Sequence, residues 1–146
     1  VYIAEPVSSG DLISEDYFET YSLPYLKQLN DRLSEKCPYM LLHICGKTME
    51  RISALKDSGI AIFSVDSLDL EEALKRAEGK ITIMGTLSPV RVLEQESPEE
   101  IYQKAQNLVQ TAGLSGGFIL APGCDLTPDT SYEHIEAMVR AVSGKE

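Results

Sequence analysis

Five short apolar runs, separated by segments with helical character, constrain the fold of this chain more than any other feature. The runs are nearly continuous in apolar residues, which is typical of parallel strands covered on both faces. Five such strand–helix units in succession predict an α/β architecture, and the pattern fits either a doubly wound sheet or a (β/α)8 barrel. We predict strands over residues 1–7, 38–45, 60–66, 80–88 and 116–124.

The segments between the predicted strands carry helix start and stop signals. Ser97 and Glu100 form a capping box with a proline directly after the serine, and Thr130 and Glu133 form a second box. Pro24 is expected to break the helix in which it lies. We predict helices over residues 14–36, 48–59 (with Thr48 as N-cap and Gly59 as stop), 70–79 and 99–113, and a last helix after Thr130.

Composition limits the class of protein. The 146 residues are 43% hydrophobic and suffice for one domain, residues 1–146, with its own core. A net charge of −10 without a basic stripe argues against a nucleic-acid or anionic-membrane partner. No apolar run reaches membrane-spanning length, and three cysteines are too few for a disulfide framework, so we expect a reduced, cytoplasmic setting.

Polar residues fall where the predicted strands end. In parallel α/β folds, ligands bind at the carboxyl ends of the strands. We therefore expect a functional site along this edge of the sheet. The residues at the strand ends are Glu5, His43, Cys45, Asp66, Thr86, Ser88, Cys124 and Asp125.

His43 and Cys45 are two residues apart in a strand, so their side chains leave it on the same side. If Cys124 converges on them, one histidine and two cysteines make a three-ligand zinc site with an open fourth position. The other interpretation is structural, because cysteine is among the most buried residue types and a histidine can be a hydrogen-bonded core residue.

The remaining polar residues have structural interpretations as well. Cys37 precedes its strand, at the opposite end of the sheet, and is expected to be structural or a bystander. His134 follows a capping box inside a helix and is expected at the surface. Four of the residues at strand ends also fit loop caps; they are Glu5, Asp66, Thr86 and Ser88.

Five stretches that together run almost the length of the chain carry a family likeness. They are "EPVSSGDLIS", "LHICGKT", "MGTLSP", "SPEEIYQKA" and "GFILAPGCDLTPDTSYEHIEAMVRAV". They resemble the uroporphyrinogen decarboxylase superfamily, and within it the methylcobalamin:coenzyme M methyltransferase branch. The resemblance implies a (β/α)8 barrel in which these five βα units are strands four to eight. Because this order leaves the first three βα units missing, we expect the C-terminal part of a barrel truncated at its N-terminus. The start at Val1 rather than at Met fits either processing or a piece of a longer protein.

The resemblance also implies a ligand set and a reaction. Methyltransferases of this branch hold zinc with His-x-Cys and a later cysteine, which here correspond to His43, Cys45 and Cys124. The decarboxylases work without metal and lack these residues. The implied activity is transfer of a methyl group from a methylated corrinoid, carried by a partner protein or free as methylcobalamin, to a thiol such as coenzyme M.

Roles for the other strand-end residues are assigned from position alone. Asp66 is expected to take the fourth zinc position or to accept the thiol proton, and Glu5 to shape the surroundings of the site. Thr86 and Ser88 are expected to bind the cofactor.

Two other functions stay open. One is a metal-free decarboxylase, and the other is a non-catalytic binding module made of a truncated half-barrel. A five-strand sheet of this kind has two open edges, so we expect it to pair with the missing N-terminal half-barrel or with a second copy of the chain.

Overall fold

A computed structural model describes residues 1–113 and 116–143 of the chain. The predicted domain also includes residues 114, 115 and 144–146, which lie outside the described residues. All five predicted strands are present within the described part, and each is shorter than predicted. They are β1 (Tyr2–Ala4), β2 (Leu41–Ile44), β3 (Ile62–Val65), β4 (Thr82–Leu87) and β5 (Phe118–Pro122).

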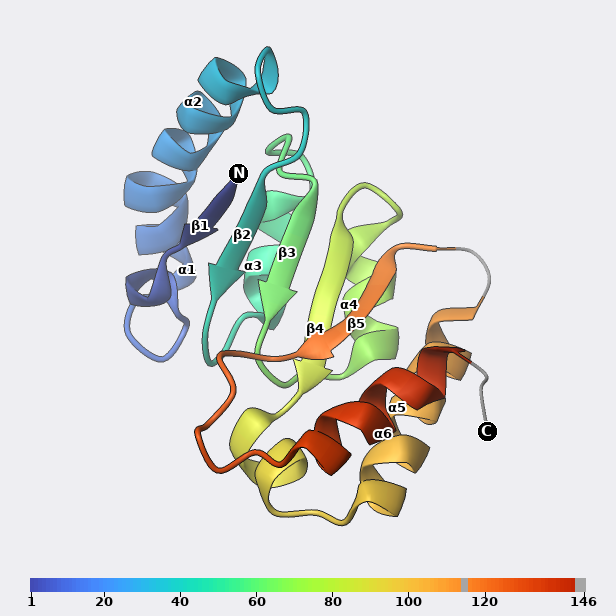
Figure 1. The fold of residues 1–146 in the computed structure, drawn as a ribbon. Coiled ribbons are helices and arrows are strands. Elements are labelled where there is room, and N and C mark those ends of the chain that lie inside the picture. The colour runs from blue at the N-terminus through green and yellow to red at the C-terminus, as the bar shows by residue number, and fades with distance from the viewer. Residues whose placement is uncertain (114–115, 144–146) are drawn as a thin grey trace.

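The strands form one sheet in the order β1-β2-β3-β4-β5, and every neighbouring pair is parallel. Figure 1 shows them side by side in chain order, with α3 (Met49–Leu55) and α4 (Leu70–Ala77) behind the sheet. A doubly wound sheet reverses its strand order at a switch point. The unbroken chain order found here is instead that of a barrel wall, and it leaves β1 and β5 as the two edges of the described sheet.

The helical segments follow the predicted alternation. The first segment is interrupted as expected near Pro24: α1 (Glu15–Tyr17) continues into a π-helical turn, η2 (Phe18–Ser22). Helix α2 (Leu23–Ser34) then begins with Pro24 in its first turn. A short helical turn, η1, follows β1, and a π-helical segment, η3, follows β4. The bounds are η1 (Pro6–Ser8), α2 (Leu23–Ser34), η3 (Pro89–Glu94), α5 (Pro98–Ala112) and α6 (Tyr132–Ser143).

Helix capping agrees with the sequence at one predicted box and differs at two sites. The box of Ser97 and Glu100 is present in full at the start of α5. The second predicted box is wrong by one residue, because the Ser131 hydroxyl accepts the His134 amide while Thr130 pairs with Thr127. Thr48 occupies the N-cap position of α3 without a side-chain cap bond, and that helix ends at Leu55, before Gly59.

The core lies between the sheet and its helices. Register pairs Leu42 with Phe63 and Phe63 with Ile83 in one row across the sheet, and all three side chains are 0% exposed. These large apolar side chains face the helices and join α2, α3 and α4 to the sheet. A second apolar cluster, which includes Leu93, Ile101 and Ala137, packs η3, α5 and α6 together.

The opposite, inner face of the sheet is only partly covered, contrary to the expectation of cover on both faces. The next register row places His43 beside Ser64 and Ser64 beside Met84. Tyr2 and Ile119, on the two edge strands, are exposed. Within residues 1–113 and 116–143, no helix has the length and hydropathy needed to span a membrane.

Candidate metal centre

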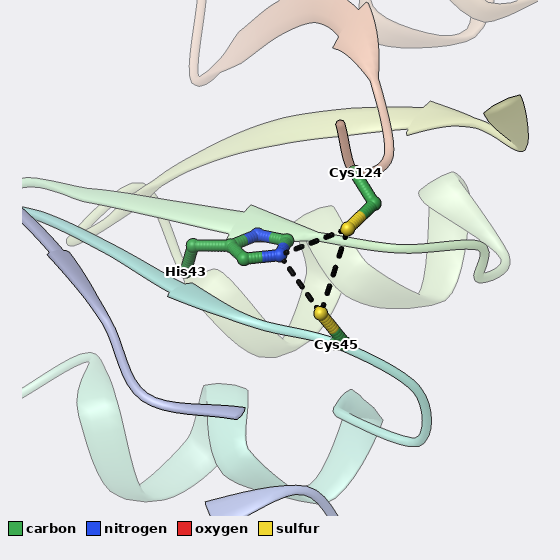
Figure 2. Close-up of side chains that lie close together, drawn as sticks. All are labelled: His43, Cys45 and Cys124. Atoms are coloured by element: carbon green, nitrogen blue, oxygen red, sulfur yellow. Dashed lines mark hydrogen bonds between the residues drawn. The ribbon is translucent and has the colours of Figure 1, made fainter. Parts of the chain in front are cut away.

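Three predicted ligands converge at the carboxyl ends of β2 and β5 (Figure 2). His43 Nε2 lies 3.0 Å from Cys45 Sγ and 3.6 Å from Cys124 Sγ, and the two sulfur atoms are 3.6 Å apart. The three ligand atoms form a candidate metal-binding group, and both cysteines are free thiols. The predicted convergence of these three side chains is therefore found.

The histidine is held by its neighbour in the sheet. His43 is buried in β2, and its Nδ1 lies 3.0 Å from Ser64 Oγ in β3, its register partner. With Nδ1 protonated and donating to that hydroxyl, the lone pair of Nε2 points at the two sulfur atoms. Such a hydrogen bond to the second ring nitrogen is how metal-binding histidines are usually oriented.

Glycines beside the two cysteines allow the backbone to approach closely. Gly46 follows Cys45 with φ +71°, and a Cβ there would collide with Asp11 and Ser9. Gly123 precedes Cys124, and a Cβ there would collide with the Asp66 backbone. Both turns at the site therefore require glycine, which the "CG" and "GC" of the sequence supply.

The electrostatic surroundings of Cys45 and Cys124 favour a bound cation. Burial raises the pKa of the Cys45 thiol from its ordinary value of 9.0 to about 11, helped by Cys124, Asp66 and Asp125. Burial, Asp125 and the two thiols also raise the pKa of Tyr2. Apart from burial, every cause is a group that is negative when ionised, so a positive ion among them would reverse the effect on Cys45.

The donor set and its spacing fit one zinc ion. With Zn–S of about 2.3 Å and Zn–N of about 2.0–2.1 Å, tetrahedral geometry places two sulfur ligands about 3.8 Å apart and sulfur and nitrogen about 3.6 Å apart. The two contacts of Cys124 are already close to these values. The His43–Cys45 pair, at 3.0 Å, would have to open by about half an ångström.

A cavity of about 640 Å³ lies against Cys124 and is lined by both acidic and basic side chains. Asp66 is one of them, and its Oδ2 also accepts a hydrogen bond of 3.4 Å from the Gly46 amide. Ser88 lines the same cavity, while its Oγ accepts the Arg91 amide at the start of η3. A smaller cavity, of about 250 Å³, borders His43, Ser64 and Cys124 on the inner face.

Four other predicted residues lie away from the three ligands. Thr86 lines a separate cavity against α5. The Glu5 amide donates to the His43 carbonyl at 2.9 Å, but its carboxylate is outside the ligand group. Cys37 lies beside the N-terminal ammonium, where the strands begin, as expected. His134 is half-buried rather than at the surface, and its Nδ1 donates to the Leu93 carbonyl at 2.8 Å.

Sequence reasoning missed Ser64 and Asp11. Ser64 looks like an ordinary strand residue, and only the β2–β3 register reveals it as the partner of His43. Asp11 lines the large cavity and accepts the Lys47 amide at 3.0 Å. Its one sequence signal is its place in the loop after the first strand, where parallel folds carry functional residues.

Comparison with known proteins places this arrangement in a family. The family model for uroporphyrinogen decarboxylase (URO-D) matches residues 1–144. The methylcobamide:CoM methyltransferase MtbA of Methanosarcina mazei is 34% identical over 140 residues, which are 95% of this chain and 40% of that protein. The uroporphyrinogen decarboxylase of a Synechococcus species is 35% identical over 140 residues, covering 90% of this chain and 36% of that protein.

A solved structure is also similar to this chain. A methyltransferase from Methanosarcina mazei matches with a TM-score of 0.85 at 27% identity, covering 96% of this chain and 40% of that one. The chain thus spans about two fifths of the proteins it matches, and its five parallel βα units fit part of a (β/α)8 barrel. It belongs to the uroporphyrinogen decarboxylase family and is similar, within that family, to the methyltransferase branch.

Proposed function

We propose that this chain carries the metal-binding part of a methyltransferase that moves a methyl group from a methylated corrinoid to a small thiol such as coenzyme M. The observation that carries the proposal is the convergence of His43 Nε2, Cys45 Sγ and Cys124 Sγ at the carboxyl ends of the strands. Similarity to proteins named methylcobamide:CoM methyltransferase supports the same reaction class.

In this proposal His43, Cys45 and Cys124 hold a zinc ion and leave one position for the thiol. Bound zinc would supply the positive charge that keeps an acceptor thiol deprotonated near neutral pH. Ser64 fixes the ring of His43 so that Nε2 faces the two sulfur atoms.

The overall reaction converts a thiol and a methylated cob(III)amide into a thioether, a cob(I)amide and a proton. The thiol sulfur bonds to the methyl carbon, while the cobalt–carbon bond breaks and its electron pair stays on cobalt. We assign the proton to Asp66, whose side chain lines the cavity next to Cys124. Ser88, in the wall of the same cavity, is assigned to contact the corrinoid, and Glu5 supports the backbone of His43.

The expected partners follow from the reaction and from the share of its relatives' length that this chain spans. A corrinoid protein or free methylcobalamin would deliver the methyl group. Because the chain spans about 40% of its methyltransferase relatives, we expect the complete site to need the remaining barrel units or a second copy of the chain.

Zinc binding tests the proposal directly. The chain should bind about one zinc ion with nitrogen and sulfur ligands. Cys45→Ser and Cys124→Ser should each weaken zinc binding by about 100-fold or more, because each removes a thiolate ligand. Cys37→Ser is the matched control and should change the affinity less than about twofold. Protein prepared without chelator that holds no zinc, and takes none up from micromolar zinc, would count against this function.

A metal-free decarboxylase is the second candidate, favoured by the 35% identity with the Synechococcus enzyme. Zinc content separates the two, since only the methyltransferase proposal requires His43, Cys45 and Cys124 to bind metal. A chain that binds zinc but transfers no methyl group, alone or combined with the missing units, would instead favour a non-catalytic binding module.

A further inference from the structure

Arg51 is an unusual residue for the interior of this protein. It lies in α3 and is 2% exposed, although arginine is among the residues least often buried. Among the described residues, its hydrogen-bond acceptors are backbone carbonyls: Nε donates to Ser8 at 3.1 Å, and Nη2 donates to Ile13 at 2.7 Å and to Ser14 at 3.4 Å. The guanidinium also lies 4.7 Å from the centre of the Phe18 ring.

These contacts hold one loop at both of its ends. The loop consists of residues 8–14, from the last residue of η1 to the N-cap of α1, and is called the 8–14 loop below. One rigid guanidinium bonds the carbonyl of Ser8 at its start and those of Ile13 and Ser14 at its end. The planar fork of arginine suits such a contact to several acceptors, whereas a lysine offers a single charged nitrogen.

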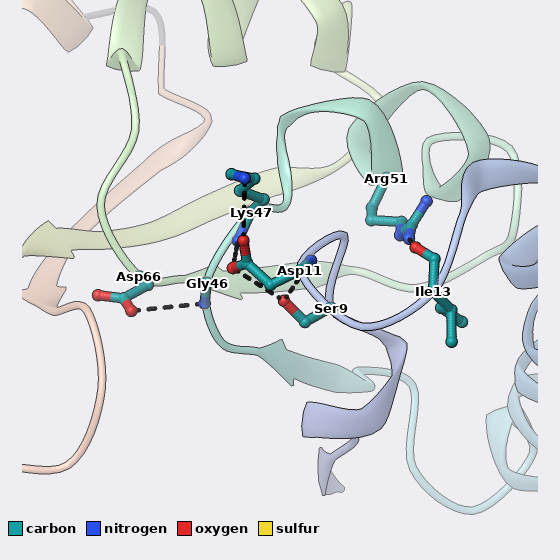
Figure 3. A network of polar contacts seen from close by, with 7 residues as sticks. All are labelled: Ser9, Asp11, Ile13, Gly46, Lys47, Arg51 and Asp66. Atoms are coloured by element: carbon teal, nitrogen blue, oxygen red, sulfur yellow. Dashed lines mark hydrogen bonds and ion pairs between the residues drawn. The ribbon is translucent and has the colours of Figure 1, made fainter.

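The middle of the 8–14 loop rests on the turn that follows Cys45 (Figure 3). The Gly10 amide donates to the Lys47 carbonyl at 2.8 Å, and Asp11 Oδ2 accepts the Lys47 amide at 3.0 Å. Asp11 Oδ1 also pairs with Lys47 Nζ at 3.1 Å, and Gly46 has no room for a Cβ against this loop. The turn is therefore held by the loop on one side and by Asp66 on the other.

We propose that Arg51 is a positioning residue for the metal site: by holding the 8–14 loop at both ends, it lets Asp11 fix the Gly46–Lys47 turn and thereby the place of Cys45. This inference rests on the proposed metal-binding role of Cys45. Arg51 itself touches neither a ligand atom nor the cavity of Cys124 in the described structure. It acts through the 8–14 loop, whose backbone it holds and whose Asp11 carboxylate in turn accepts the Lys47 amide.

A purely structural role for Arg51 gives a different expectation. An arginine that only stabilises α3 would, when replaced, weaken the whole fold, and every slowly exchanging amide would lose protection to a similar degree. A positioning role predicts loss confined to the loop and turn, together with a change at the metal site. Replacing Asp11, which is exposed, should then reproduce the change without disturbing the core.

The first measurement is amide hydrogen exchange on the metal-free chain. In Arg51→Met, the Gly10 and Lys47 amides should lose at least about tenfold in protection, while the β2 amides of Leu42 and Ile44 keep theirs. Asp11→Ala should expose the Lys47 amide in the same way. Arg76→Met is the matched control, because it removes a half-buried arginine whose ion pair with Glu72 lies on α4.

The second measurement is cobalt(II) binding, which reports the ligand geometry through its visible and thiolate charge-transfer bands. Arg51→Met and Asp11→Ala should each lower cobalt affinity by about tenfold and alter these bands. The double variant should lose little more than either single variant, because both act through one chain of contacts. Arg51→Lys should fall between wild type and Arg51→Met.

The outcomes separate this inference from the function on which it rests. A wild-type chain that binds no cobalt overturns the proposed function. If wild type binds cobalt and both variants bind it equally well with unchanged bands, only the positioning role is overturned. If Arg51→Met fails to fold, Asp11→Ala decides: unchanged Lys47 protection and unchanged cobalt affinity in that variant contradict the proposal.

Discussion

Neighbouring residues of each strand lie on opposite faces of the sheet, and the two faces carry different kinds of side chain. Leu42 and Phe63 lie on the face covered by helices and are fully buried. The residues that follow them, His43 and Ser64, lie on the other face and bond to each other. Successive side chains of a strand point in opposite directions, so one register row carries buried apolar side chains and the next carries His43, a candidate ligand, with its partner Ser64.

This division has a physical consequence for mutations. Apolar side chains on the helix face stabilise the fold by burial, about 25 cal/mol for each Å² of apolar surface removed from water. Burial of the polar groups on the inner face adds little to the free energy of folding, and hydrogen bonds between these groups hold them in place. Mutations in the first row should therefore change stability, and mutations in the second should change metal binding with little change in stability.

The largest effect is expected on the helix face. Phe63→Ala should lower the free energy of unfolding by about 3–5 kcal/mol, because it removes a fully buried aromatic ring and leaves a cavity. Urea unfolding of the metal-free chain measures this. Ile119→Ala, on the inner face and 39% exposed, is the control and should cost about 1 kcal/mol or less. Equal losses at the two positions would remove the proposed contrast between the faces.

The next effect is the pH dependence of zinc binding. The pKa of Cys45, raised to about 11, means that this thiol keeps its proton near neutral pH, so binding must release it. Apparent zinc affinity should fall by at least about tenfold for each pH unit between pH 8 and pH 6, or about 2.7 kcal/mol in all. Competition titrations with a chelator of known pH dependence measure it. Constant affinity over this range would contradict thiolate ligation.

The stability of the metal-free chain depends on pH in the opposite direction from its zinc affinity. Since the pKa of Cys45 is higher in the folded chain than its ordinary value of 9.0, its contribution to stability is complete below about pH 9. That contribution is lost as the pH rises towards 11. Between pH 6 and pH 8, Cys45 should therefore leave the unfolding free energy of the metal-free chain unchanged while zinc affinity changes strongly.

A good part of this arrangement could be predicted from the sequence. The apolar runs predicted all five strands, because parallel strands are rich in apolar residues. The rule that ligands bind at the carboxyl ends of parallel strands indicated that His43, Cys45 and Cys124 could lie together. Strand lengths were overestimated: Glu5 and Cys45 already belong to the turns that follow their strands. Local patterns carry this information because each depends on residues close in the chain.

Long-range backbone contacts could not be predicted. Arg51 looks like a surface residue of an amphipathic helix, and its acceptors are carbonyl oxygens, which every residue possesses. The bond from His134 to the Leu93 carbonyl was missed for the same reason. Thr86 was assigned to the site by its strand-end position, but it lines the cavity against α5. Thr86 is still within β4, so its strand-end position alone does not decide which cavity its side chain lines.

A smaller effect tests the hydrogen bond within the inner row. Ser64→Ala should weaken zinc binding by about tenfold, because His43 Nδ1 loses the partner that orients the ring. The free energy of unfolding should change by about 1 kcal/mol or less. Ser58→Ala is the matched control: Ser58 is also buried and bonded, but between α3 and β3 on the helix side, so zinc affinity should not change. Equal zinc affinity in both variants would show that Ser64 does not orient the histidine.

The smallest effect is expected at Thr86. Thr86→Val preserves shape and replaces only the hydroxyl of a residue that lines the cavity against α5. Zinc affinity should change by less than about twofold, since no ligand contacts this side chain. Isothermal titration of zinc into the two proteins measures the difference. A tenfold loss of zinc affinity would mean that Thr86, in β4, affects the metal site although it lines the cavity against α5.

X-ray absorption spectroscopy of the zinc-loaded chain tests the central claim most directly, because it identifies the ligand atoms. We expect one nitrogen at about 2.0–2.1 Å and two sulfur atoms at about 2.3 Å, from His43, Cys45 and Cys124. On addition of a small thiol, the sulfur count should rise from two to three. Zinc held by nitrogen and oxygen alone, or a sulfur count that stays at two when thiol is added in excess, would contradict a thiol-activating metal centre in this chain.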